Sequence, residues 1–137
     1  MQDPRKLHVY EHALRLSVAV YRLTDRFPAS QRFVLAAQMQ RAAISIGSNI
    51  AEGCGRRSAR ELHQFLHIAL GSARELGFQL HVTGSLNDGD ASARAEIREE
   101  LDCVERMLNR LAARVRVAAR RSTVSQPTPN AKHLTPH

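Results

Sequence analysis

Apolar residues recur three and four positions apart along most of the chain, which is the period of amphipathic helices. The pattern breaks at only three places, which are Phe27-Pro28, Gly53-Cys54-Gly55 and the turn-rich run from Gly84 to Gly89. Connections this short join neighbouring helices that run in opposite directions. The sequence therefore predicts an all-α, up-and-down antiparallel four-helix bundle.

Local signals give the expected helices their ends. Pro28 ends the first helix, because proline has no amide donor and disfavours helical geometry in the residue before it. Ser30 is expected to cap the second helix, and Ser58 with Glu61 forms a capping box for the third. The expected helices cover residues 7–26, 31–52, 58–83 and 90–120.

The chain of 137 residues is long enough for one domain. Beyond Arg121 it contains three prolines and few apolar residues, so this segment cannot bury enough surface to offset the entropy of ordering it. We therefore expect the bundle to occupy residues 1–121 and residues 122–137 to form a disordered C-terminal tail.

The first expected helix has more apolar surface than one bundle core needs. One stripe consists of Leu7, Tyr10, Leu14, Val18 and Tyr21, and a second consists of Val9, Ala13, Leu16, Val20, Leu23 and Phe27. Together they cover roughly 220° of the helix circumference. Soluble chains rarely expose so large a patch, which favours a partner subunit over burial within the chain. We assign Val9, Leu16, Val20 and Leu23 to this subunit interface.

Polar residues form a stripe along the second and third expected helices. Its members are Arg41, Ser45, Asn49, Glu52, Ser72 and Glu75. The stripe is either a half-buried network that fixes the helix register or an ordinary solvated surface, and the small residues around it favour the network. Antiparallel pairing places Arg41 near Glu75, so we expect an ion pair between these two side chains.

Three runs of the sequence form a recognisable pattern. They are VYEHALRLSVAVYRLTDRFP (Val9–Pro28), RAAISIGSNIAEGCGRRS (Arg41–Ser58) and ELHQFLHIALGSARELGFQL (Glu61–Leu80). In this order they resemble the bacterial four-helix-bundle family named for proteins encoded in 23S rRNA intervening sequences.

The resemblance implies a bundle that assembles into a homopentameric ring, and it does not imply an enzyme. A related accessory protein of diversity-generating retroelements is similarly a basic pentameric bundle, which works with a reverse transcriptase and nucleic acid. The partners that the resemblance implies are therefore further copies of the chain, RNA or DNA, and a protein such as a reverse transcriptase.

The chain is basic, with 20 Lys and Arg against 13 Asp and Glu and a formal net charge of +7. The arginines that could contact phosphate are Arg56, Arg57, Arg106, Arg110, Arg114, Arg116, Arg120 and Arg121. Those of the fourth helix could instead only complement its dipole, and the Arg56-Arg57 segment could be only a structural turn. Because aromatic residues are absent among them, we expect phosphate contact without sequence preference.

Two histidine patterns resemble metal sites. His8, Glu11 and His12 match the letters of H-x-x-E-H but have no third ligand and no cleft, and His63 and His67 lack a matching carboxylate or thiolate. The two cysteines fit neither a metal spacing nor a disulfide framework. We expect no metal, no cofactor and no catalytic residue.

The N-terminus has no secretory signal, and the chain has no apolar run approaching the roughly 20 residues that span a bilayer. We expect a cytoplasmic protein with no membrane partner. Its expected function is that of a homo-oligomeric, non-enzymatic accessory protein that binds nucleic acid independently of sequence. The alternative is an oligomeric scaffold that binds a protein partner and has no nucleic-acid role.

Overall fold

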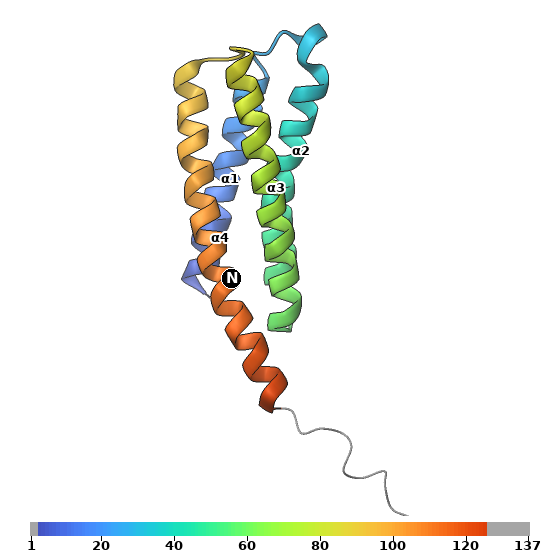
Figure 1. Cartoon of the computed structure of the whole chain (residues 1–137), viewed down its shortest axis with the longest axis vertical. Coiled ribbons are helices and arrows are strands. Elements are labelled where there is room, and N and C mark those ends of the chain that lie inside the picture. Colours follow the sequence, from blue (N-terminus) through green and yellow to red (C-terminus); the bar gives the residue numbers. More distant parts are fainter. Residues whose placement is uncertain (1–2, 126–137) are drawn as a thin grey trace, which may run out of the picture.

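The structure, a computed structural model of the chain, describes residues 3–125. It contains four helices, which are α1 (Pro4–Thr24), α2 (Ala29–Cys54), α3 (Ala59–Ser85) and α4 (Ala91–Ser125). Consecutive helices run antiparallel and pack side by side, and α1 completes the bundle by packing against α4 (Figure 1). The expected all-α, up-and-down four-helix bundle is confirmed.

The core lies along the bundle axis and receives large apolar side chains from every helix. Fully buried examples are Leu16, Ile46, Leu66 and Leu108. Burying a side chain of this size stabilises the fold by about 1.5 to 3 kcal/mol, so the core holds the four helices together. No helix of the described chain is long and apolar enough to cross a membrane.

Two helix starts differ from the sequence expectation. Helix α1 begins at Pro4 rather than at residue 7, because the Asp3 carboxylate accepts a 2.9 Å hydrogen bond from the amide of Arg5 and proline suits the first helical position. Helix α2 begins at Ala29 with Pro28 at its N-cap and no side-chain cap, so Ser30 does not have the capping role expected of it.

The ends of α3 and α4 are only partly as expected. Ser58 caps α3 by accepting a 3.1 Å hydrogen bond from the amide of Glu61. Helix α4 continues to Ser125, so the first residues of the expected tail are helical and the 122–137 boundary is wrong at its start. The rest of that tail, residues 126–137, lies outside the described residues. The last part of α4 extends beyond the ends of the other helices (Figure 1).

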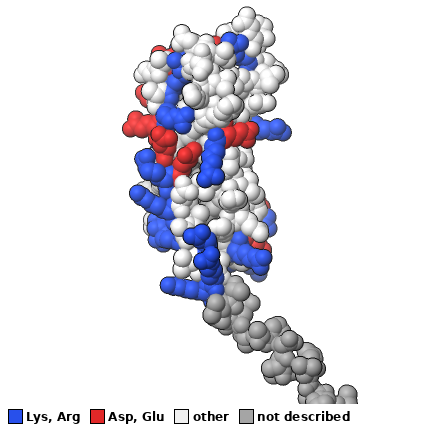
Figure 2. Space-filling model, viewed as in Figure 1, with Lys and Arg blue, Asp and Glu red and all other residues white. Residues whose placement is uncertain are grey.

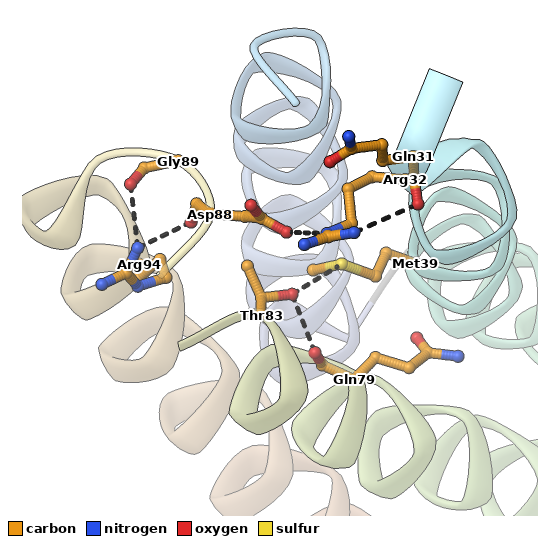
Figure 3. A network of polar contacts seen from close by, with 8 residues as sticks. All are labelled: Gln31, Arg32, Met39, Gln79, Thr83, Asp88, Gly89 and Arg94. Atoms are coloured by element: carbon orange, nitrogen blue, oxygen red, sulfur yellow. Dashed lines mark hydrogen bonds and ion pairs between the residues drawn. The ribbon is translucent and has the colours of Figure 1, made fainter. Parts of the chain in front are cut away.

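The α1–α2 and α3–α4 turns lie together at one end of the bundle, which we call the closed end. There the Arg32 side chain of α2 forms an ion pair with the buried carboxylate of Asp88 in the α3–α4 turn. The Arg94 guanidinium donates to the carbonyl oxygens of Asp88 and Gly89 at 2.6 and 2.8 Å. Figure 3 shows how these contacts attach the turn to both α2 and α4.

Gly89 occupies a position in the closed end that requires glycine. Its φ is +71°, and a Cβ atom there would lie 2.5 Å from Leu23 Cδ1. Beside this turn, the Thr83 hydroxyl donates a hydrogen bond to the Gln79 carbonyl at 2.8 Å and lies 3.3 Å from the Met39 sulfur (Figure 3). These contacts pack the closed end tightly within the chain, although the buried side-chain oxygen of Gln79 beside it accepts no hydrogen bond in the described residues.

Candidate nucleic-acid interface

The opposite end of the bundle, the open end, consists of the start of α1, the α2–α3 turn and the last turns of α4. These three segments enclose a hollow of about 310 Å³, which we call the basic hollow. Its lining residues are Asp3, Arg5, Lys6, Arg56, Arg57, Ser58, Ala59, Leu62, Leu111, Arg114, Val115 and Ala118. Five of these side chains are cationic and one is a carboxylate, so the hollow attracts anions.

Two of the five cations are held by carboxylates. The guanidinium of Arg5 contacts Asp3 at 3.2 Å, and that of Arg56 contacts Glu52 at 2.6 Å. The hydrogen bonds from the Arg5 side chain and amide, with the nearby charge of Lys6, lower the pKa of the Asp3 carboxyl. Arg56 also lies over the ring of Phe65, 5.0 Å from its centroid, which fixes its direction.

The other three cations of the basic hollow are Lys6, Arg57 and Arg114. Within residues 3–125 none of them forms an ion pair with a carboxylate. They come from α1, the α2–α3 turn and α4, so segments far apart in the sequence bring their charge together. Charges in this arrangement remain available to an external anion.

The exposed end of α4 continues the positive surface past the hollow. Its arginines are Arg110, Arg114, Arg116, Arg120 and Arg121, all of them exposed. A second hollow of about 300 Å³ lies on the other flank of α4 and includes Arg60, Arg116 and Arg120. Figure 2 shows the Lys and Arg side chains gathering toward this end, below a band of acidic side chains.

Arg106 does not belong to the open end, contrary to the sequence prediction. It lines a separate hollow together with His12, Glu96, Glu99, Glu100 and Cys103. Neighbouring carboxylates repel phosphate, so Arg106 is a poor candidate for a phosphate contact. The expected strip is thereby shortened to the arginines from Arg110 onward.

The basic surface also includes Arg5, Lys6 and Arg60, which the sequence pattern did not single out. A signal for them was present, because an up-and-down bundle places the start of its first helix beside the turn between its second and third helices. The prediction that the first helix starts at residue 7 left Arg5 and Lys6 outside the bundle.

The subunit interface assigned from the sequence is wrong. Val9, Leu16 and Val20 have 0% exposure and Leu23 has 3%, because they form the core contacts of α1 within a single chain. Two apolar stripes on one helix do not reveal which of them faces inward. The other stripe of α1 is the exposed one.

An uncharged apolar face lies along α1 and α2. Its large exposed members are Leu7, Leu14, Val18, Tyr21, Phe33 and Ile44. Between the two helices runs a groove of about 240 Å³, which is lined by Tyr10, Ala13, Leu14, Ser17, Ile44, Gly47, Ser48 and Ala51. None of these lining residues carries a charge, so the α1–α2 face suits an apolar partner surface.

The polar stripe between α2 and α3 is brought together only in part. The hydroxyls of Ser45 and Ser72 lie 2.8 Å apart across the two helices, and the Asn49 amide donates to the Ser45 hydroxyl at 3.1 Å. Glu52 pairs with Arg56 instead, at the surface.

The expected ion pair between Arg41 and Glu75 is wrong. In the described part of the chain Arg41 forms no ion pair, and Glu75 accepts a 3.3 Å hydrogen bond from Gln79. Both residues are exposed, so water solvates their charges. An ion pair between them would therefore add little to the stability of the fold.

The candidate metal ligands also have other surroundings. His12 Nδ1 lies 2.6 Å from Glu100 Oε1, and this contact joins α1 to α4. In residues 3–125 no group of three or more His, Cys, Asp or Glu side chains is arranged to hold a metal ion. Burial raises the pKa of the Cys54 thiol, with the nearby charge of Lys6 opposing this, so the thiol stays protonated at neutral pH.

The fold and the open end define a small four-helix-bundle protein with one cationic end. The 23S rRNA-intervening sequence protein family matches residues 5–110, and the chain therefore belongs to this family, as the sequence resemblance predicted. The comparison with curated proteins gives no match.

The chain is also similar to a protein of unknown function from the S23 ribosomal protein family of Bacteroides thetaiotaomicron. The two structures agree with a TM-score of 0.74 at 23% sequence identity, over 80% of this chain and 98% of that chain. At this identity the likeness shows the fold alone.

Proposed function

We propose that the protein is a non-enzymatic homo-oligomer that binds the phosphate backbone of RNA or DNA without sequence preference, as an accessory to another nucleic-acid process. The observation that carries the proposal is the unpaired charge of the open end, where Lys6, Arg57 and Arg114 line one hollow and exposed arginines follow along α4. Such a surface gains affinity by releasing the counterions of the nucleic acid.

Assembly would multiply this effect. The exposed, uncharged α1–α2 face supports contact with a second copy, and the family resemblance implies a ring of five. A surface that binds phosphate weakly in one copy binds far more tightly when several copies engage one nucleic acid, because later contacts are intramolecular.

The binding experiment titrates the full chain into short labelled RNA and DNA duplexes at several salt concentrations. Light scattering in the same buffers gives the assembly mass. The proposal expects an oligomer whose affinity falls steeply with salt and differs little between sequences. An intact oligomer that binds neither duplex at low salt would overturn the nucleic-acid part.

The assembly experiment compares two charge insertions. Leu14→Glu with Ile44→Glu places carboxylates on the α1–α2 face and should give a folded monomer, because unpaired charges in an apolar interface are costly. Phe78→Glu is the matched control, since Phe78 is 70% exposed and lies on α3 away from this face. Unchanged mass in the double variant would show that the interface lies elsewhere.

The second candidate function is a scaffold for a protein partner. The observation that favours it is the exposure of Phe78 (70%) and Ile68 (50%) on α3, which the α1–α2 face does not include. An apolar protein contact weakens little with salt, whereas phosphate binding weakens steeply, so the salt titration separates the two functions.

A further inference from the structure

The basic hollow has features that a contact surface for a continuous phosphate backbone does not need. It is concave, and its charges come from three separate segments rather than from one helix face. Its floor is apolar, with Leu62, Leu111 and Val115 buried beneath the cationic rim. An apolar floor lowers the local dielectric and strengthens any charge interaction made above it.

The contacts within the chain show which groups remain for a ligand. Glu52 and the ring of Phe65 hold Arg56, and Asp3 holds Arg5. The Ser58 oxygen accepts a hydrogen bond from the Glu61 amide, so Ser58 has only its O–H left to donate to a ligand. The unpaired cations of the hollow are then Lys6, Arg57 and Arg114, one from each segment.

Three unpaired cations that line one hollow match one type of anion better than others. A phosphate monoester carries a charge of about −1.5 to −2 at neutral pH and three strong acceptor oxygens, so each cation can contact an oxygen of its own. A phosphodiester within a strand carries a single charge and is flanked by sugars on both sides. A terminal phosphate can enter a hollow that a continuous strand can only cross.

We propose that the basic hollow binds a terminal phosphate monoester, with Lys6, Arg57 and Arg114 as its ligands. This proposal deepens the nucleic-acid function, because the end of a strand is the form in which RNA or DNA presents such a group. The arginines on the other flank of α4 bind the backbone beyond that end. Free phosphate has the same chemistry, and the experiment separates the two sources.

The test measures the affinity of the full chain for a 5′-phosphorylated strand. The comparison strand has a 5′-hydroxyl and is one nucleotide longer, so the two carry similar total charge. The proposal expects about ten-fold tighter binding of the phosphorylated strand, since a monoester adds charge-assisted hydrogen bonds at one point. A strand phosphorylated at its 3′ end tests whether the site distinguishes a 3′-phosphate from a 5′-phosphate.

Two double variants identify the site. Arg57→Gln with Arg114→Gln should remove the preference for the phosphorylated strand. The matched control Arg116→Gln with Arg120→Gln removes the same charge from the other flank of α4. It should lower the affinity for both strands equally and so keep the preference for the phosphorylated strand. Circular dichroism checks that all variants fold.

Equal affinity for the phosphorylated and the longer hydroxyl strands would overturn the terminal-phosphate site and leave backbone binding intact. If neither strand binds, the proposed nucleic-acid function is wrong. Calorimetry with inorganic phosphate then tests whether the basic hollow binds phosphate. Phosphate binding that the Arg57 and Arg114 substitutions remove would support the site. Absence of phosphate binding would overturn it.

Discussion

The two ends of the bundle use arginine in opposite ways. At the closed end Arg32 is paired with the buried Asp88 carboxylate, and Arg94 donates to two turn carbonyls. At the open end Arg57 and Arg114 have no carboxylate partner within residues 3–125. Arg32 and Arg94 therefore hold the fold together at one end, whereas Arg57 and Arg114 present charge to the solvent at the other.

This difference explains why the count of basic residues is a poor guide to function. An arginine whose donors are already occupied adds to the net charge but offers a phosphate little. The function of the chain should therefore depend on the open end, while its stability should depend on the closed end.

The largest expected effect is at Gly89 of the closed end. Gly89→Ala should lower the free energy of unfolding by about 2 to 4 kcal/mol, because the left-handed backbone and the contact with Leu23 both disfavour a Cβ atom. Denaturant unfolding at fixed protein concentration measures the loss. If the free energy of unfolding falls by less than it does for an ordinary surface substitution, the result would contradict the packing described for this turn.

The Asp88→Asn variant tests the ion pair of the closed end. We expect a loss of about 1 to 2 kcal/mol, since Asn keeps the shape of the side chain but leaves the half-buried guanidinium of Arg32 without its counter-charge. Arg57→Gln at the open end is the control and should change stability by less than about 0.5 kcal/mol. Similar losses in both variants would remove the distinction between the ends.

The contact between Ser45 and Ser72 lies between the two ends and should matter less. A double-mutant cycle with Ser45→Ala and Ser72→Ala should give a coupling energy of about 0.5 to 1 kcal/mol, which is the usual value of one hydrogen bond. The same cycle for Arg41 and Glu75 should give a coupling near zero. A clear coupling between that second pair would contradict the structure.

The smallest effect concerns the start of α1 at the open end. Because Arg5 lowers the pKa of Asp3, the Asp3 cap is fully formed above the ordinary aspartate pKa and is lost as the pH falls through the lowered value. The NMR shift of the Arg5 amide should report this transition. Asp3→Asn, which caps without titrating, should remove it.

The fold was predictable because it follows from local patterns, namely apolar period, turn residues and caps. The orientation of α1 was not predicted, because both of its stripes are apolar. The exposed stripe differs in composition mainly by its two tyrosines, Tyr10 and Tyr21. The pair of Arg32 and Asp88 joins α2 to the α3–α4 turn, through a turn geometry that no spacing in the sequence reveals. The basic hollow could be predicted only in part. Arg57 lies in a recognisable turn, whereas placing Lys6 in the hollow requires knowing that α1 begins before residue 7.

The most direct test of the account compares salt dependence in two charge-matched variants. One variant replaces Arg57, Arg114 and Arg120 at the open end with Gln. The other replaces Arg22, Arg26 and Arg41, which are exposed but lie away from the open end, also with Gln. The measured quantity is the slope of log affinity against log salt for a DNA duplex.

The open-end variant should lose about one unit of slope for each phosphate contact removed, whereas the other variant should keep the wild-type slope. Equal slopes in the two variants would show that binding follows net charge alone. That result would contradict the claim that the open end is the nucleic-acid interface.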